Sequence, residues 1–191
     1  MRLSGRLALL VITFIAASPL LGAEPANKAV TYHDEKCGLH FEYPAGWAVE
    51  KDEECDFTIS PTDLAERLKS LDVDVWSFEV SIHEGTFLAE AADAGFDFQR
   101  GRWSLGGFDF LAGKAEPFTM PPWWGLRGSS SVRCYHPGGG SAGFCNAVTV
   151  VMQSATVRSG DARIVRIQGY RQSRSAIDAV LRTFRFDFSG R

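Results

Sequence analysis

Histidine, the side chain that most often serves as a catalytic base, occurs only four times in this chain of 191 residues, at His33, His40, His83 and His136. His40 and His83 each stand on the polar side of an alternating strand pattern, where an exposed side chain is the ordinary case. Glu79 shares a face with His83, but four strand residues separate them by about 13 Å, too far for a base and its orienting group. The histidines therefore predict no catalytic dyad.

Two further patterns resemble catalytic or cofactor-binding motifs, but the residues around them do not fit those motifs. Ser129–Ser131 is a run of serines, but none of the three stands in a Gly-x-Ser-x-Gly turn that would expose it as a nucleophile. Gly138–Gly143 satisfies Gly-x-Gly-x-x-Gly, the phosphate-binding turn of dinucleotide-binding domains. That turn needs a helix after it, whereas this segment follows Pro137 and enters an apolar strand pattern. We expect a hairpin loop there, and neither a cofactor nor a catalytic residue.

Four cysteines allow three disulfide pairings, which the sequence alone does not decide: Cys37, Cys55, Cys134 and Cys145. Each of the local pairs, 37 with 55 and 134 with 145, brackets a predicted hairpin, which favours these two bonds. The alternative is a metal site, because Cys37-x-x-His40 and Cys134-x-His136 bring soft ligands close together. Neither spacing matches a Cys-x-x-Cys metal clip, and the predicted compartment is oxidising, so we expect no metal.

The chain carries a formal charge of −3 and lacks the basic footprint that nucleic acids require. Carboxylates cluster at Asp52–Glu54 and Asp56, but their spacing differs from that of a calcium-binding EF-hand loop, and we expect a solvated turn. Arginines gather in the C-terminal third, where they suit either an anionic partner or dispersed surface charge: Arg158, Arg163, Arg166, Arg171, Arg174 and Arg182.

Two adjacent tryptophans, Trp123 and Trp124, follow Pro121-Pro122 in the segment Met120–Gly125. Neighbouring side chains of an extended segment point in opposite directions, so we expect one ring to be exposed as an anchor for a protein or a sugar. Alternatively, the loop folds over the sheet, buries one ring and packs the other on the prolines. Trp123, Trp124, Arg163 and Arg166 are the predicted binding residues.

The N-terminal 23 residues have the pattern of a secretory signal peptide. Arg2 and Arg6 precede an apolar run, Leu7–Ala17, that is shorter than the roughly 20 residues of a membrane-spanning helix. Cleavage is expected after Ala23, and Glu24 stands where a lipoprotein would have its lipidated cysteine. We therefore predict a periplasmic or secreted protein with no membrane span or lipid anchor.

Residues 24–36 are polar and are predicted to form a flexible lead-in. From residue 37, short alternating strand patterns predominate and three short helices are predicted, near residues 61–71, 87–94 and 175–184. Gly106-Gly107 is expected to form the turn of a hairpin, and Ser175 with Asp178 has the spacing of a helix capping box. These patterns predict a single α+β domain over residues 37–191, with a mainly antiparallel sheet flanked by short helices.

Two segments carry a resemblance to a known family. GLHFEYPAGW at 38–47 and SAIDAVLRTFRF at 175–186 resemble the opening and closing of the PsbP-like fold. That fold is an α/β/α sandwich shared by the extrinsic photosystem II protein, the Ran-binding nuclear import factor and several exported bacterial families. The resemblance implies an adaptor or accessory role, and it assigns no individual binding residue. The two expected disulfides are not part of the common pattern.

The sequence favours an exported, non-enzymatic accessory or protein-binding module of the bacterial envelope, with another envelope or secreted protein as its partner. The alternative is a secreted ligand-binding or hydrolytic protein with a site between the Trp123–Trp124 loop and the arginine-rich strands. These alternatives differ in whether a catalytic constellation assembles from residues that are distant in the sequence.

Overall fold

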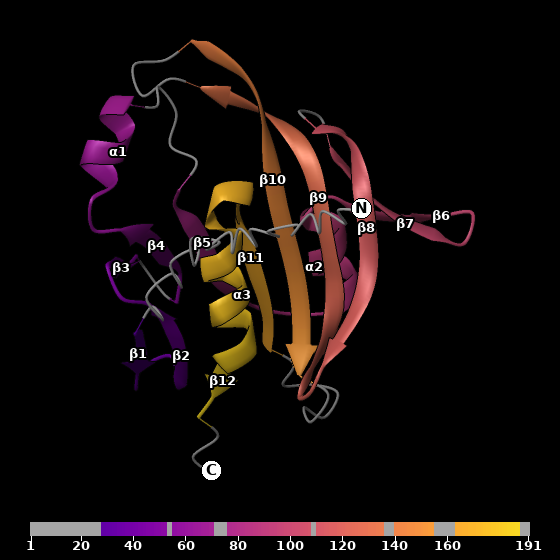
Figure 1. Cartoon of the computed structure of the whole chain (residues 1–191). Coiled ribbons are helices and arrows are strands. Elements are labelled where there is room, and N and C mark those ends of the chain that lie inside the picture. Colours follow the sequence, from indigo (N-terminus) through magenta and orange to yellow (C-terminus); the bar gives the residue numbers. More distant parts are fainter. Residues whose placement is uncertain are drawn as a thin grey trace, which may run out of the picture.

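The computed structural model describes residues 28–52, 55–70, 76–107, 110–135, 140–154 and 163–187. The predicted signal peptide, residues 1–23, lies outside the described residues. Most of the described chain forms a nine-stranded antiparallel sheet (Figure 1). In sheet order its strands are β3 (Trp47–Lys51), β4 (Phe57–Pro61), β5 (Phe78–Glu84), β11 (Arg163–Tyr170), β10 (Ser141–Ser154), β9 (Trp123–Tyr135), β8 (Phe110–Met120), β7 (Arg102–Gly107) and β6 (Phe96–Gln99).

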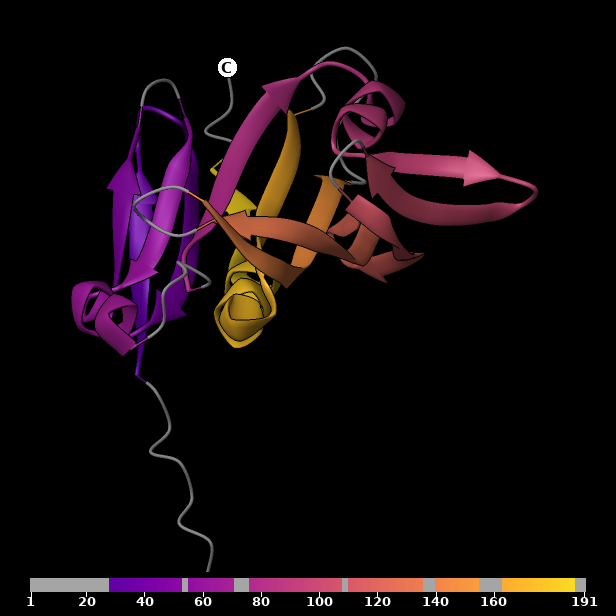
Figure 2. The ribbon, with the colours of Figure 1, turned by 90° about the horizontal axis from the view of Figure 1, so that it is seen from above.

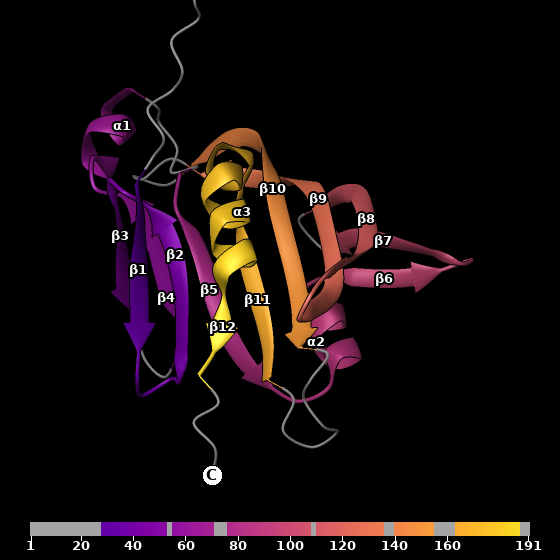
Figure 3. The same ribbon diagram turned by 60° about the horizontal axis from the view of Figure 1, so that its bottom comes forward.

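A smaller antiparallel sheet and three short helices complete the fold of the described residues. The smaller sheet has the order β1 (Ala29–Asp34), β2 (Leu39–Pro44) and β12 (Arg185–Phe186). The helices are α1 (Leu64–Ser70), α2 (Phe87–Asp93) and α3 (Arg174–Thr183), the last preceded by the 3-10 turn η1 (Arg171–Ser173). α3 and α2 lie on opposite faces of the large sheet, as Figures 1 and 3 show. The predicted α+β class, with helices on both faces of an antiparallel sheet, is confirmed.

Each face of the large sheet has its own core. On the α3 face, Ile177 and Val180 of the helix pack in one buried cluster with Val150 of β10. On the α2 face, Phe87 of the helix belongs to a second buried cluster with Val151 of β10. The central strands are therefore buried on both sides, which explains why β10 contains a nearly continuous apolar run instead of a polar–apolar alternation.

Both favoured disulfides are present in the structure. Cys37–Cys55 links the turn before β2 to the segment before β4, with Cα atoms 5.9 Å apart, and so ties the small sheet to the large one. Cys134–Cys145 links β9 to β10, with Cα atoms 5.8 Å apart. These bonds consume the thiols that the alternative metal sites would need. Among the described residues, no group of three or more His, Cys, Asp or Glu side chains is arranged to hold a metal ion.

The structure differs from the sequence prediction at several element ends. Within the predicted lead-in, Ala29–Asp34 form β1, which pairs with β2 along its whole length. Most β1 side chains are exposed, so the strand carries little apolar alternation to reveal it. α3 begins at Arg174, directly after the 3-10 turn, so its N-cap is Ser173 and not Ser175. The Ser173 side chain makes no capping hydrogen bond, and its hydroxyl donates to the Trp76 carbonyl at 2.5 Å.

Gly106 and Gly107, which were expected to form a hairpin turn, belong instead to strand β7. Residues 108–109, which lead to β8, lie outside the described residues. β6 and β7 form a hairpin that extends away from the body of the molecule (Figure 2). None of the helices in the described ranges is both long enough and apolar enough to cross a membrane.

Candidate functional site

Trp123 is a core residue. Its side chain is only 1% exposed, and its indole N–H donates to the Phe184 carbonyl at 2.9 Å. The ring also makes edge-on contacts with Phe184 and Phe186, with centroid distances of 5.7 Å in each case. Trp123 therefore fastens the end of α3 to the large sheet and presents no surface to a partner.

Trp124 lies on the opposite face of β9, as the alternation of an extended segment predicts. It is 39% exposed, and its ring centroid lies 4.4 Å from that of Phe87 in α2. The predicted loop is a tight turn at Pro121 and Pro122 between β8 and β9, and both tryptophans already belong to β9. The exposed ring packs on an aromatic side chain of α2.

The two predicted binding arginines are engaged within the fold. Arg163 donates to the Cys37 carbonyl at 2.7 Å and lies over the Phe186 ring, 5.3 Å from its centroid. Arg166 pairs with Glu90 at 3.1 Å and with Asp93 at 2.7 Å, both on α2. Phe186 thus contacts both Trp123 and Arg163 on the α3 face. Trp124 and Arg166 lie on the α2 face, so the four predicted residues do not gather in one place.

Ser81, His83 and Glu90 have the residue types of a hydrolytic triad. The Ser81 hydroxyl lies 3.0 Å from Nε2 of His83, and the Glu90 carboxylate lies 3.6 Å from the same nitrogen. A triad needs the nucleophile and the carboxylate on different ring nitrogens, so that the carboxylate orients the base while the base takes a proton. Because one nitrogen faces both groups, the geometry in this structure is not that of a triad.

A second histidine cluster lies at the small sheet. Asp187 accepts from Nδ1 of His40 at 2.6 Å, and its other oxygen lies 2.9 Å from Nε2 of His33. His33 and His40 are cross-strand partners on β1 and β2. Within the described part of the chain, neither imidazole contacts a hydroxyl or thiol that could be a nucleophile. The cluster fastens the C-terminal end of the chain to the hairpin.

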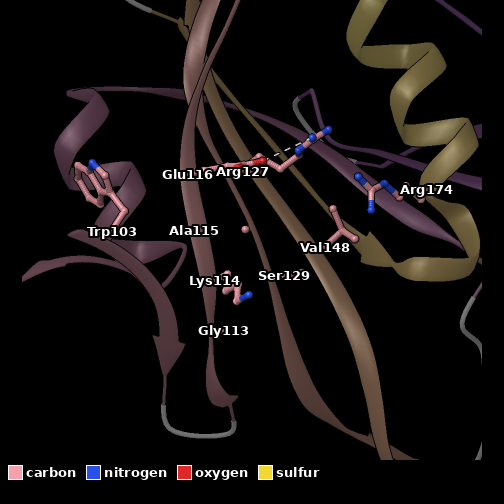
Figure 4. Close-up of a pocket in the computed structure, with 10 residues that line it drawn as sticks. Trp103, Gly113, Lys114, Ala115, Glu116, Arg127, Ser129, Val148 and Arg174 are labelled. Atoms are coloured by element: carbon pink, nitrogen blue, oxygen red, sulfur yellow. Dashed lines mark ion pairs between the residues drawn. The ribbon is translucent and has the colours of Figure 1, made fainter.

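The cavity that best fits a binding site lies on the α3 face of the large sheet, over β8, β9 and β10 and not over β11. Its volume is about 470 Å³, and its walls include Lys114 of β8, Arg127 and Ser129 of β9 and Arg174 of α3 (Figure 4). In Figure 4, Arg127 and Arg174 approach from opposite sides, one from the sheet and the other from the helix. Two elements that are far apart in the sequence therefore supply cations to one hollow.

This hollow continues into a second one of about 350 Å³ toward the start of α3. The two share Lys114, Ser129 and Arg174, and the second adds Asn146 of β10 and Arg171 of η1. We call the combined surface the basic groove and define it by six residues: Lys114, Arg127, Ser129, Asn146, Arg171 and Arg174.

Two carboxylates partly neutralise the basic groove. Asp178 of α3 lies 3.5 Å from Arg127 and 4.0 Å from Arg174, and Glu116 lies 3.7 Å from Arg127. Within the described ranges, no carboxylate forms an ion pair with Lys114 or Arg171. A chain with a net charge of −3 therefore concentrates two uncompensated cations in one groove, next to hydroxyl and amide groups. This set of donors can bind carboxylates or other anions, and it contains no base beside a nucleophile.

The sequence held part of the signal for this groove. Arg171 and Arg174 belong to the arginine-rich third, and Arg127, Ser129 and Ser131 fall on one face of a strand by alternation. Lys114 carried no signal of its own, because only the pairing of β8 with β9 sets Lys114 opposite Ser129. A bulge in β8 between Leu111 and Lys114 shifts that register, and local patterns do not reveal it.

A scan against protein-family models finds no match for this chain, and a search of curated proteins finds none. The solved structures that it resembles include the Ran-binding protein Mog1p of Saccharomyces cerevisiae, which is 8% identical with a TM-score of 0.49. That match covers 85% of this chain and 97% of Mog1p. They also include cyanobacterial PsbP of Synechocystis, which is 16% identical with a TM-score of 0.39 over 88% of this chain and 99% of that one.

A protein of Bacteroides thetaiotaomicron is 13% identical with a TM-score of 0.34, and the match covers 84% of this chain. The chain spans about half, 49%, of that protein's length. Identities this low extend to the fold alone and carry no function across. These solved structures thus include a PsbP and a Ran-binding protein, the two kinds of protein named with the resemblance of the opening and closing segments.

Proposed function

We propose that this chain is an exported, non-enzymatic protein-binding module of the bacterial envelope, and that it docks its partner through the basic groove. The observation that carries the proposal is the open α3 face of β8–β10, where Lys114 and Arg171 present charge that no described carboxylate neutralises. An uncompensated cation pair in an acidic protein favours an anionic partner surface.

Two observations support the non-enzymatic and exported parts of this proposal. Both histidine clusters have the geometry of structural fasteners, since one places two partners on one nitrogen and the other places two histidines on one carboxylate. Two disulfides in a chain of this size suit an oxidising compartment. Together with the signal peptide expected at residues 1–23, they favour a periplasmic or secreted location.

The second candidate is a small-ligand-binding protein. The larger hollow, of about 470 Å³, lies within the roughly 300–1,000 Å³ range of small-molecule sites. Neither Trp123 nor Trp124 lines this hollow, although the sequence placed the ligand site near them. Trp123 is buried in the core, and Trp124 packs against α2. The experiment below distinguishes a protein partner from a small ligand.

The test is site-specific photo-crosslinking in the native envelope fraction. A benzophenone side chain replaces Ser129 in the groove, and a control protein carries it at Lys36, in the turn between β1 and β2. We expect one saturable protein adduct from position 129, lost when Arg171→Glu is added, and no such adduct from position 36. A stoichiometric small-molecule mass on the purified protein, without a charge-sensitive adduct, would favour the second candidate instead.

A further inference from the structure

Two exposed aromatic side chains extend the basic groove along the sheet. Tyr135 is 56% exposed and Phe144 is 59% exposed. Phe144 pairs with Arg133, and two residues further along the hairpin Asn146 pairs with Ser131. Side chains at alternate strand positions share a face, so Phe144 lies on the face of Asn146 and Tyr135 on the face of Ser129. The groove is therefore continuous with an aromatic end, which also carries the exposed Arg133.

The Cys134–Cys145 disulfide belongs to the same hairpin but lies on its other face. Cys134 and Cys145 occupy the strand positions next to Tyr135 and Phe144, and adjacent positions point to opposite sides. The bond joins the two strands behind the aromatic pair. It holds that end of β9 and β10 together without covering either ring, so the aromatic pair is presented on a braced support.

The length and charge of this surface indicate what it binds. From Arg127 to Tyr135, β9 spans about 26 Å, the length of an extended peptide of about eight residues. Its cations run along the whole strand: Lys114 lies opposite Ser129, and Arg133 lies opposite Phe144 at the end that carries the aromatics. Glu116 and Asp178 remain among the cations, and they disfavour a dense polyanion such as polyphosphate. Spaced carboxylates, separated by neutral residues, fit this pattern of charges better.

We infer that the ligand of the basic groove is an extended acidic segment of a partner protein, whose carboxylates meet Lys114 and Arg171 and whose apolar side chain packs against Tyr135 and Phe144. This inference rests on the proposed function and gives the chemistry of the partner. The cations supply attraction and orientation, while the aromatic end selects segments that carry an apolar residue beyond the acidic run.

The test measures fluorescence anisotropy with labelled synthetic decapeptides and the oxidised, mature-length protein. The probes alternate Glu with Ser and carry Leu-Leu at one end or the other. Matched peptides replace Glu by Gln, or Leu-Leu by Ala-Ala. We expect the Glu peptides to bind at least about tenfold more tightly than the Gln peptides, with an affinity that falls as salt is added.

Protein variants locate the binding. Lys114→Glu and Arg171→Glu are each expected to weaken the Glu peptides by about tenfold, whereas the matched reversal Lys36→Glu changes affinity by less than about twofold. Phe144→Ser is expected to weaken the Leu-Leu peptides by about fivefold and to leave the Ala-Ala peptides unchanged. All four substituted side chains are exposed, and circular dichroism melting curves verify that each variant is folded.

Several outcomes would overturn the inference. Equal binding of Gln and Glu peptides, no binding of either, or tighter binding of polyphosphate than of any peptide would each exclude an acidic segment as the ligand. Sedimentation that shows a dimer abolished by Lys114→Glu would make a second copy of this chain the occupant. If acidic peptides fail while the Ser129 protein adduct persists, the proposed function survives and only the chemistry assigned to the partner is wrong.

Discussion

Neighbouring side chains on β9 have opposite structural roles, and Trp123 and Trp124 illustrate this best. Trp123 is 1% exposed and donates a hydrogen bond to Phe184, whereas Trp124 is 39% exposed and rests on Phe87. The large ring of Trp123 fills space in the core, and its indole N–H donates the hydrogen bond to the Phe184 carbonyl. Replacing Trp123 by alanine removes both contributions.

We therefore expect Trp123→Ala to lower the free energy of unfolding by about 3–5 kcal/mol, and Trp124→Ala to lower it by only about 1 kcal/mol. Urea denaturation followed by circular dichroism measures both values. Equal losses would contradict the division of the two rings between core and surface, and the Trp124 variant is the matched control for changing a tryptophan on this strand.

At the residue scale, alternation predicted that the two tryptophans point in opposite directions, because that rule depends only on local backbone geometry. Which arginines remain free of carboxylates could not be predicted. Arg163 and Arg166 were selected from the same arginine-rich third as Arg171, yet Arg166 is neutralised by α2 and Arg163 is held at the Cys37 carbonyl. Those partners come from segments that are distant in the sequence.

At the scale of the elements, the close approach of strands β9 and β10 depends on Gly125. Gly125 is buried opposite Met152, and a Cβ atom at this position would overlap the Val151 carbonyl. A side chain here requires the two strands to separate in the middle of the doubly buried part of the sheet.

Gly125→Ala is expected to lower the free energy of unfolding by about 2–3 kcal/mol through this backbone displacement. Gly106→Ala in β7 is the matched control, because no heavy atom lies within 4 Å of a Cβ there, and it should change stability by less than about 0.5 kcal/mol. Chemical denaturation compares the two, and equal stabilities would show that β9 adjusts without cost.

The turn between β1 and β2 depends on Asp34. Its carboxylate accepts from the Cys37 N–H at 2.8 Å and from Lys51 of β3 at 2.6 Å. Burial acts to raise the pKa of Asp34, but these hydrogen bonds to the charged form outweigh burial, so the pKa lies below its ordinary value. Asp34 thus connects the small sheet to the large sheet through a charge.

A carboxyl group whose folded pKa is lowered stabilises the protein above its unfolded pKa, and that stability is lost as the pH falls through the folded pKa. Asp34→Asn should therefore cost about 1–2 kcal/mol at pH 7, and the difference from the parent should shrink below about pH 4. Thermal melting from pH 7 to pH 2.5 measures this, with Glu35→Gln in the same exposed turn as the control. A constant difference at all pH values would contradict a charge-dependent role.

The elements with strong apolar periodicity were the ones that the sequence predicted. Ile177, Val180 and Leu181 have the spacing of one helical face, and the structure buries all three. β1 was missed because an edge strand with mostly exposed residues has no buried face to impose a pattern. At the start of α3, Ser175 and Asp178 have the spacing of a capping box, but the helix begins at Arg174, one residue before Ser175.

In the whole molecule, the two disulfides brace different parts of the fold. Cys37–Cys55 closes a separation of 18 residues and Cys134–Cys145 one of 11 residues. Loops of this length are expected to constrain the unfolded chain by about 3 kcal/mol each in the loop-entropy account. The first bond fastens the small sheet, while the second lies behind the aromatic end of the groove.

Replacing either cysteine pair by alanine should therefore lower the free energy of unfolding by about 2–4 kcal/mol. The two pairs should differ in binding: the variant without Cys37–Cys55 keeps its affinity for the acidic Leu-Leu peptides, and the variant without Cys134–Cys145 loses part of it. Denaturation and anisotropy on the same preparations test this. Equal binding losses would contradict a specific bracing role for the second bond.

The overall class could be predicted from the sequence, since alternating strands, three short helices and the two bracketing segments all indicate an antiparallel α+β fold. The basic groove could not, because it needs β8, β9, β10 and α3 in one place. Lys114 and Arg174 lie far apart along the chain, and their approach follows from strand order and from the seating of α3 by Trp123. No local sequence pattern indicates that Lys114 and Arg174 come close together.

The small sheet joins the two ends of the described chain. Phe186 of β12 pairs with Leu39 of β2, and Phe184 stacks on Phe41 with a centroid distance of 5.8 Å. While the polypeptide is being synthesised, the strands of the large sheet therefore leave the ribosome before α3 and β12, which cover the α3 face. Until α3 and β12 follow, the apolar side chains of that face have no helix to pack against, which makes the incomplete chain prone to aggregation.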